Sequence, residues 1–298
     1  MNKCAILSMD NLEGHMVYDD LLHAPLKKAN WEFETVSWQQ QGVDWDQYNL
    51  VMIRSTWDYQ LNSDKFIETL QQIENSSAHL DNPLDIVRWN IDKKYLRDLE
   101  SKGIQILPTL WRDSIDENEI NDFFEQLQAE EIVIKPCISA GAFNTFRLTP
   151  SQAIEKSSAL VDAFQQRSCM IQSFSQAIID EGEFSIFYFD GEYSHTVLKK
   201  PKTNDFRVQE EFGGLLKKVE PEAALKRHAE RVLDVVGQSL LYARLDFVRD
   251  NSDATNSCFA LMEAELIEPS LYFNLDPESP RRYVEAMQRR MKRLGVIE

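Results

Sequence analysis

The sequence lacks several features on which whole classes of protein depend. Its four cysteines, Cys4, Cys137, Cys169 and Cys258, lie far apart without a CxxC pair, so neither a disulfide framework nor a cysteine metal site is expected. No uninterrupted apolar run approaches the ~18 residues of a membrane span. The apolar start of the chain breaks at Ser8, too early for the core of a signal peptide, and we expect a cytoplasmic protein.

Positive charge is also scarce. The chain has 32 Lys and Arg against 49 Asp and Glu, a net charge of -17. Nucleic acids require a basic stripe and anionic membranes attract basic segments, so we expect neither as a partner. A small anion in a local basic pocket stays compatible with this charge. The five histidines show no ligand spacing, and no Walker A loop, Rossmann fingerprint, nucleophile elbow or kinase signature is present.

Apolar residues make up 43% of the 298 positions, which is enough to build a large core. The length suggests two domains or one subdivided domain. The first ~85 residues alternate between strand and helix patterns, which predicts an α/β layer with a mostly parallel sheet. Strands are expected at 4–7, 31–37 and 50–55, and helices at 17–30 and 63–74.

Beyond residue 90 the pattern changes. Asp190-Gly191 between two apolar runs is the strongest hairpin signal of the chain. We expect extended segments at 104–108, 131–135, 169–172, 184–189 and 193–199, and helices at 91–102, 116–128, 151–166, 222–241 and 281–294.

Three carboxylates lie on two strand-like runs near the end of the chain. Side chains of a strand alternate between faces, so Glu263 and Glu265 share one face, and Asp246 can join them from the neighbouring strand. Buried unpaired carboxylates are costly, and a hard cation such as Mg²⁺, which prefers oxygen ligands and substrate phosphates, removes that cost. An edge hairpin with its acids in water is the alternative, and these residues alone leave both open.

Two lysines and a loop arginine are candidates for phosphate contacts. Lys135 ends an apolar strand before Pro136, and the small residues 139–142 behind it suit a loop over phosphates. Lys93 opens a helix, and Arg207 stands in a loop that precedes Gly213-Gly214. The alternatives are a lysine that caps a strand, a solvated helix start and an ordinary surface loop.

A polar cluster follows the apolar strand at 50–55, where strand ends line the crevice of an α/β sheet. Arg54 offers a fork for a carboxylate and Asp58 an anion for an ammonium group. Ser55 and Thr56 add hydroxyls, and Trp57 and Tyr59 add apolar walls, which suits a small zwitterion. The alternative is a surface turn with a packed tryptophan.

Taken in order, these motifs resemble the ATP-grasp superfamily, glutathione synthetase type. The resemblance runs from about Asn90 to Phe273. It is carried by Asn90-Ile91-Asp92-Lys93, Val133-Ile134-Lys135-Pro136, Met170-Ile171-Gln172-Ser173-Phe174, Gly182-Glu183, Asp205-Phe206-Arg207 with Gly213-Gly214, Arg244-Leu245-Asp246 and Glu263-Ala264-Glu265. The first 85 residues and Glu265-Leu266-Ile267-Glu268-Pro269-Ser270 look more narrowly like the cycloserine synthetase-like (O-ureidoserine cyclo-ligase-like) branch. Departures are Glu265 where asparagine is common, Ser185 where an arginine is common, and a single glycine in the loop after Lys135.

The resemblance implies an ATP-grasp fold, α/β in the first part and α+β in the C-terminal part. Its divisions are a Rossmann-like pre-ATP-grasp domain over 1–85, a central subdomain over 86–168 and a C-terminal subdomain over 169–298. It implies ATP and Mg²⁺, or Mn²⁺, as cofactors. The implied roles are nucleotide binding by Lys93, Lys135, Gln172, Ser173, Phe174 and Glu183, metal binding by Asp246, Glu263 and Glu265, catalysis by Arg207 and Arg244, and substrate binding by Arg54, Ser55, Thr56, Asp58 and Tyr59.

The implied activity is a carboxylate–amine ligase that forms a C–N bond on a small amino-acid-like substrate through an acylphosphate. An ATP-dependent kinase or intramolecular cyclase with the same site is one alternative, and a non-catalytic nucleotide-binding regulatory protein is another. The expected partners are small molecules, with a homodimer as the oligomeric option.

Overall fold

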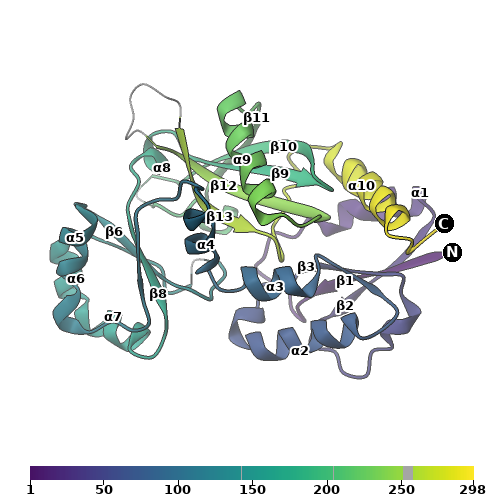
Figure 1. Ribbon diagram of the computed structural model, residues 1–298, viewed down its shortest axis with the longest axis horizontal. Helices are drawn as coiled ribbons and strands as arrows, with labels where there is room; N and C mark the ends of the chain where they lie inside the picture. Colours follow the sequence, from purple (N-terminus) through teal and green to yellow (C-terminus); the bar gives the residue numbers. More distant parts are fainter. Residues whose placement is uncertain (142, 204, 251–257) are drawn as a thin grey trace.

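The computed structural model describes residues 1–141, 143–203, 205–250 and 258–298, which form three sheets with helices around them (Figure 1). The sheets follow one another along the chain. Parallel pairing in the first and antiparallel pairing in the other two confirm an α/β start and an α+β remainder. The expected domain boundaries at 85 and 168 stay predictions.

The first sheet has four parallel strands in the order β2-β1-β3-β4. All six residues of its strand β3 are buried, as expected for a parallel strand that is covered on both faces. The predicted parallel layer is therefore confirmed. The strands are β1 (Asn2–Ser8), β2 (Trp31–Ser37), β3 (Leu50–Ser55) and β4 (His79–Asp81).

The helices of this part are α1 (His23–Lys28), α2 (Ser63–Glu74) and α3 (Leu84–Asn90). The predicted helix over 63–74 is confirmed, with the Asn62 side chain as its cap. The helix predicted over 17–30 is too long. A 3-10 turn at Asp19–Leu22 precedes the short α1, because Pro25 is tolerated in a first turn but not inside a helix.

The second sheet is antiparallel, in the order β5-β8-β6-β7. The helices predicted over 116–128 and 151–166 are both interrupted, the first after a 3-10 turn at Glu117–Glu119 and the second at Lys156. The strand expected at 104–108 begins instead at Thr109. The elements are β5 (Thr109–Arg112), β6 (Ile132–Pro136), β7 (Phe146–Leu148), β8 (Cys169–Ser173), α5 (Asp122–Leu127), α6 (Pro150–Glu155) and α7 (Ser157–Phe164).

The third sheet is antiparallel, in the order β11-β10-β9-β12-β13. The predicted hairpin is confirmed, since Asp190 and Gly191 both have positive φ, 50° and 80°, as a two-residue turn of the mirror-image type requires. The elements are α8 (Ala177–Asp180), β9 (Glu183–Phe189), β10 (Glu192–Lys200), β11 (Leu215–Val219), α9 (Ala223–Val236), β12 (Tyr242–Asp250), β13 (Cys258–Glu265) and α10 (Ser279–Arg293).

The helix predicted over 91–102 begins later, as α4 (Tyr95–Ser101). Residues 91–94 form a turn in which the Asp92 carboxylate accepts a hydrogen bond from the Lys94 backbone N–H at 2.9 Å. A side chain that binds its own backbone in this way competes with helix formation. Lys93 therefore stands on a connection and not on a helix face.

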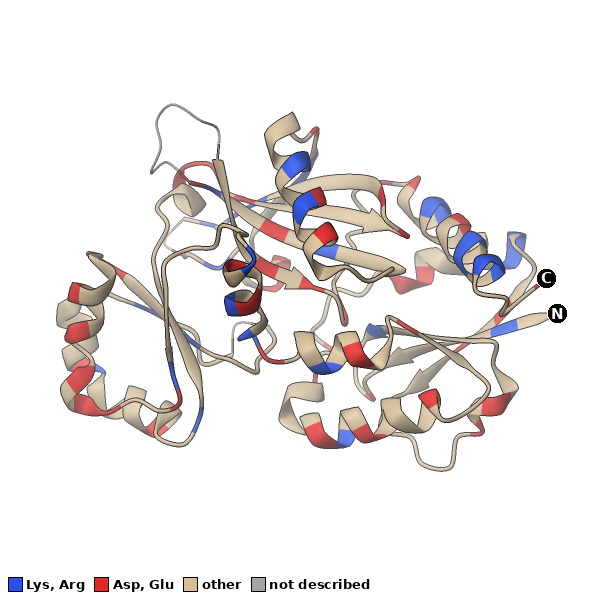
Figure 2. Ribbon diagram, in the orientation of Figure 1, with Lys and Arg blue, Asp and Glu red and all other residues tan. Residues whose placement is uncertain are grey.

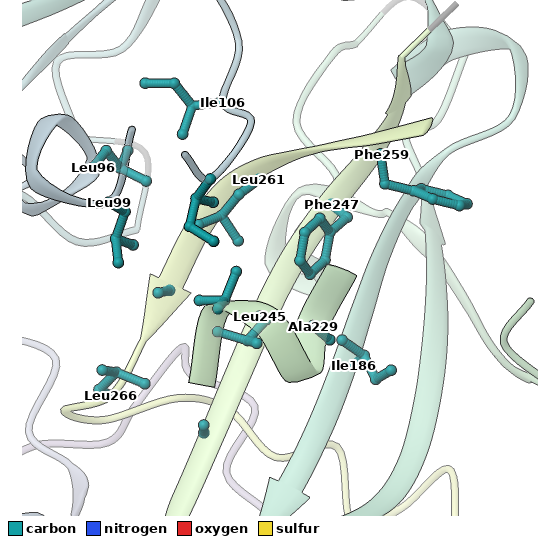
Figure 3. Packing of buried hydrophobic residues seen from close by; sticks show 14 of the residues in the cluster. Leu96, Leu99, Ile106, Ile186, Ala229, Leu245, Phe247, Phe259, Leu261 and Leu266 are labelled. Carbon is teal, nitrogen blue, oxygen red and sulfur yellow. The ribbon is translucent and has the colours of Figure 1, made fainter. Parts of the chain in front are cut away.

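One face of β12 and β13 is apolar and packs on α4 and α9, as Figure 3 shows for Leu245, Leu261, Leu99 and Ala229. Period-two alternation then turns the polar residues of the same strands to the other face. This packing fixes where the charged side chains of these strands point.

The first and third sheets are joined through buried polar contacts. The Asn82 amide donates to the carbonyls of Tyr242 and Leu266 at 2.9 and 2.7 Å. Arg290 of α10 pairs with the buried Asp81 at 2.7 Å. Lys and Arg gather on α10 in Figure 2, and its arginines 281, 282, 289, 290 and 293 all form ion pairs. Within the described residues, no helix is both long and apolar enough to cross a membrane.

Candidate active site

A cleft of about 650 Å³ is lined by strand residues of the second and third sheets and by loop residues that belong to the first, a size typical of a small-molecule site. It brings together most of the side chains selected from the sequence. Those that line it are Tyr59, Lys93, Lys135, Gln172, Ser173, Phe174, Glu183, Arg207, Arg244, Asp246, Glu263 and Glu265.

The carboxylates of β12 and β13 reach the cleft through the strand register. Asp246 pairs with Glu263 and Arg244 with Glu265, so all four stand on the face opposite the apolar packing. Phe247 pairs with Leu261, which leaves Met262 as an extra residue. Such a bulge re-aims side chains, and both Met262 and Glu263 line the cleft as a result.

Asp246 is held by three groups of the chain. It is 3% exposed and accepts hydrogen bonds from Ser185 Oγ at 2.5 Å, Lys199 Nζ at 3.2 Å and Arg244 Nη2 at 3.0 Å. Burial opposes ionisation, but the two cations outweigh it and lower the pKa of Asp246. Asp246 is therefore a fixed anion.

Glu263 and Glu265 each contact one cation. Lys93 Nζ lies 2.7 Å from Glu263 and also donates to the Ser139 carbonyl at 2.9 Å, while Arg244 pairs with Glu265. Burial raises the pKa of Glu265 to about 8, because Asp246 and Glu263 offset the help of Arg244. The empty cleft thus disfavours the charged form of Glu265.

The charged form of Glu268, beyond the end of β13, is disfavoured in the same way. Burial raises its pKa to about 7, against the attraction of Lys93 and with the repulsion of Glu263. Tyr59 lies beside it, and burial followed by the Glu268 charge raises the Tyr59 pKa well above its usual value.

These carboxylates were tested as a magnesium site. Among the described residues, no three His, Cys, Asp or Glu side chains form a ready ligand group, because Lys93, Lys199 and Arg244 stand between the carboxylates. Asp246, Glu263 and Glu265 share a face as predicted, but each is paired with a cation of the chain and not free to bind a metal as it stands. The donor chemistry nevertheless fits a hard cation, since three carboxylates offer oxygen ligands on one sheet face.

Lys135 differs from the other cleft lysines because it has no partner within the part of the chain that the structure describes. Among the described residues no carboxylate or carbonyl binds its ammonium, and burial lowers its pKa despite the nearby Glu263. A half-buried cation that lines a cleft and has no partner among the described residues is suited to bind an anion that comes from outside. Of the small-residue loop behind it, Ala142 lies outside the described residues.

The segment expected to meet a nucleotide base lies at the end of β8. The backbone N–H groups of Ser173 and Phe174 already donate to Pro108 and Glu131 at 3.2 and 2.9 Å. Arg147 stacks over the Phe174 ring at 3.7 Å, which makes this ring a fixed wall of the cleft.

Glu183 and Lys199 form a buried pair across β9 and β10. Lys199, which sequence reasoning missed, also binds Asp246, so this lysine links Glu183 to Asp246. The sequence of β10 did not predict a buried Lys199, because a lysine near the end of a strand is usually exposed.

Arg207 lines the mouth of the cleft on a loop. Its guanidinium binds Asp205 at 2.9 Å and stacks over Phe212 at 3.8 Å, with 36% of the side chain exposed. Arg207 therefore stands on a loop as expected, with its guanidinium held by Asp205 and Phe212.

The cluster at the end of β3 is placed differently from expectation. Arg54 is 2% exposed and pairs with Asp19 at 3.0 Å, and the Ser55 hydroxyl binds the same carboxylate at 2.6 Å. Asp58 accepts from Trp38 Nε1 at 2.6 Å and from Gln39 at 2.8 Å.

The expected opening of Arg54, Ser55, Thr56 and Asp58 toward the cleft is therefore wrong for the side chains as the structure places them. The reason is the buried Asp19, a long-range partner that neutralises Arg54. Of this cluster, Trp57 and Tyr59 reach the cleft, together with Gln60.

Comparison with known proteins agrees with this geometry. Residues 106–254 match the family described as prokaryotic glutathione synthetase, ATP-grasp domain, and residues 4–82 match the N-terminal domain of the D-cycloserine synthetase DcsG. The chain is 27% identical over 275 residues to the cycloserine biosynthesis protein DcsG of Streptomyces lavendulae, which covers 87% of this chain and 89% of that protein.

Solved structures share the fold over nearly the whole chain. A crystal structure of D-cycloserine synthetase DcsG has a TM-score of 0.83 at 23% identity and covers 97% of this chain and 100% of its own. The D-alanine–D-alanine ligase of Bacillus anthracis complexed with ATP has a TM-score of 0.69 at 14% identity and covers 99% and 98%. The chain thus belongs to the ATP-grasp ligases of the prokaryotic glutathione synthetase type, a family of ATP-dependent ligases that form C–N bonds.

Proposed function

We propose that this enzyme uses Mg²⁺ and ATP to activate the carboxylate of a small amino-acid-like substrate as an acylphosphate, which a nitrogen nucleophile then attacks. The observation that carries the proposal is the unpaired Lys135 in the same cleft as Lys93 and the carboxylates of β12 and β13. One small cleft therefore contains both the cations that would bind phosphates and the carboxylate oxygens that would bind a metal.

On the nucleotide side, we assign Lys135 and Lys93 to the phosphates. Lys135 has no competing partner, whereas Lys93 shares its charge with Glu263 and is available once a metal occupies that carboxylate. Gln172, Ser173 and Phe174 form the wall for the base, with Phe174 fixed by Arg147. Glu183 is assigned an indirect role, since it fixes Lys199.

On the metal side, Glu263 and Glu265 are the proposed direct ligands, and Asp246 is the third carboxylate, opposite Glu263 in the register. Bound Mg²⁺ would supply charge neutralisation at the transferring phosphoryl group. Arg244 orients Asp246 and Glu265 at the same time, which keeps the carboxylates in place before substrates arrive.

In the proposed reaction a substrate carboxylate oxygen attacks the γ-phosphorus, the bond to the ADP oxygen breaks, and ADP leaves. A nitrogen lone pair then attacks the acyl carbon, and inorganic phosphate leaves with the bonding electrons while the nitrogen loses a proton. Arg207, once released from Asp205, is the group assigned to the developing anion. The cleft positions these groups, and positioning with electrostatic stabilisation is most of the catalysis that phosphoryl transfer needs.

A second candidate is the intramolecular version, in which the nucleophile belongs to the activated molecule itself. The similarity to DcsG, named for cycloserine biosynthesis, over 87% of the chain favours it. The kinase and regulatory alternatives have no comparable support.

The deciding experiment measures ADP release over a panel of small carboxylates with and without added amines. A ligase releases ADP only with a carboxylate, and faster with an amine. A cyclase reaches its full rate without a second molecule. ADP release by no carboxylate in the panel contradicts the proposed function.

A further inference from the structure

Glu268 is a cleft carboxylate for which neither the phosphate nor the metal assignment has a use. It lines the cleft three residues beyond Glu265, and among the ion pairs of the described residues none includes it. The two cations whose charges act on the Glu268 carboxylate are Lys93 and Arg244, and both form ion pairs with other carboxylates.

Two residues at the end of β3, Arg54 and Trp57, hold the backbone around Glu268. Trp57 Nε1 donates to the Glu268 carbonyl at 2.9 Å, and Arg54 Nη2 donates to the Pro269 carbonyl at 3.1 Å. Arg54 is itself held by Asp19. These two hydrogen bonds hold the backbone of residues 268 and 269, and the Glu268 side chain lines the cleft.

The surroundings of Glu268 are aromatic. Tyr59 lies beside its carboxylate, and Trp57, whose ring lies 5.4 Å from that of His15, forms the adjoining wall. A carboxylate that lines a cleft beside aromatic side chains, with no cation of its own among the described residues, is suited to bind an ammonium group through an ion pair.

We propose that Glu268 binds the ammonium group of the amino-acid substrate and so selects amino acids over plain carboxylates. This inference rests on the proposed function and deepens it. It replaces Asp58, whose carboxylate is bound by Trp38 and Gln39 outside the cleft. Trp57 and Arg54 are positioning residues, because they act through the backbone of residues 268 and 269.

The test measures binding by calorimetry in the presence of Mg²⁺ and a non-hydrolysable ATP analogue. The probes are two matched pairs, serine with 3-hydroxypropanoate and alanine with propanoate, with both enantiomers of each amino acid. In each pair only the amino group differs. The wild-type protein should bind at least one amino acid ~10-fold or more tightly than its partner, because hydrogen bonds to charged groups are strong.

Glu268→Gln should weaken binding of that amino acid ~10–100-fold and leave the deamino partner and the ATP analogue unchanged. Glu268→Asp should restore part of the preference. Asp58→Asn is the matched control, since it removes the rival carboxylate and should keep the full preference. Trp57→Phe, which keeps the ring but loses the N–H donor, should reduce the preference without a change in ATP-analogue affinity.

Three outcomes overturn the inference: no preference for the amino acid in either wild-type pair, an unchanged preference in Glu268→Gln, or a loss confined to Mg²⁺ affinity. The last would make Glu268 a metal ligand. Because binding is read without turnover, this result is separate from the ADP-release assay. A preference lost in Glu268→Gln supports the ammonium site even if no carboxylate releases ADP, the result that contradicts the ligase assignment.

Discussion

Replacement of Lys135 is the perturbation whose effects the structure separates best. The Lys135 ammonium lies in the cleft with no partner among the described residues, and burial lowers its pKa. A buried unpaired charge costs free energy in the empty protein and gains it when an anion arrives. Lys135→Met, which keeps the length of the side chain, should therefore weaken ATP binding while the empty protein keeps or gains stability.

The expected loss follows from the value of a charge-assisted hydrogen bond, about 1.5–3 kcal/mol. That corresponds to an ATP affinity ~10–150-fold lower. The stabilisation of the folded protein by ATP scales with the logarithm of the affinity, so this free energy should shrink by the same amount. The melting temperature should therefore rise less on ATP addition than it does in the wild-type protein. Calorimetry gives the affinity, and thermal unfolding with and without ATP gives both stabilities.

The control is Lys94→Met. Lys94 follows Lys93 in the chain but pairs with the exposed Asp113 at 3.1 Å and does not line the cleft. ATP affinity should be unchanged in this variant. An unchanged affinity in Lys135→Met, or an equal loss in both variants, refutes the placement of the phosphates at Lys135.

Three further changes have defined outcomes. Asp246→Asn should reduce Mg²⁺-ATP turnover ~10–100-fold with a smaller effect on folding, and turnover at the wild-type rate would speak against the metal site. Arg54→Ala should lower the free energy of unfolding by about 3–5 kcal/mol in a denaturant titration, because it leaves Asp19 buried without its partner; a loss below 1 kcal/mol would contradict the buried pair. His195 is buried, which lowers its pKa from 6.5 to about 4, so the unfolded state takes up the proton first and stability falls between pH 6.5 and 4. His195→Gln should flatten that fall by up to about 3 kcal/mol, and an equally steep fall in the variant would rule out His195 as its source.

The parts of the site that depend on local periodicity were predictable. Glu263 and Glu265 share a face because a strand alternates, and Asp190-Gly191 forms its turn because both residues accept positive φ. The bulge at Met262 was not predictable, since no residue preference marks an extra residue in a strand.

The parts that depend on distant partners could not be predicted. Arg54 looks like a carboxylate receptor in sequence, but Asp19 is 35 positions away and meets it only in the fold. Lys199 of β10 likewise reaches Asp246 of β12 across the one strand between them, β9. Glu268 stood in a recognised segment, yet its importance depends on a backbone contact from Trp57, 211 positions earlier.

The predicted start of one helix was wrong for a local reason. The helix predicted over 91–102 loses its start because the Asp92 side chain binds the backbone of Lys94. This loss moves Lys93 onto a connection, where its ammonium can meet both Glu263 and the Ser139 carbonyl. The error in the helix therefore coincides with a residue of the site.

The most direct test of the central claim follows an oxygen atom. A carboxylate substrate that releases ADP is labelled with ¹⁸O in its carboxyl group, and the inorganic phosphate is analysed by mass spectrometry. Attack of the carboxylate on the γ-phosphorus, followed by loss of phosphate, transfers one labelled oxygen to the phosphate. The account predicts singly labelled phosphate in proportion to ADP. Unlabelled phosphate, or ADP released without any phosphate, would contradict activation of the carboxylate as an acylphosphate.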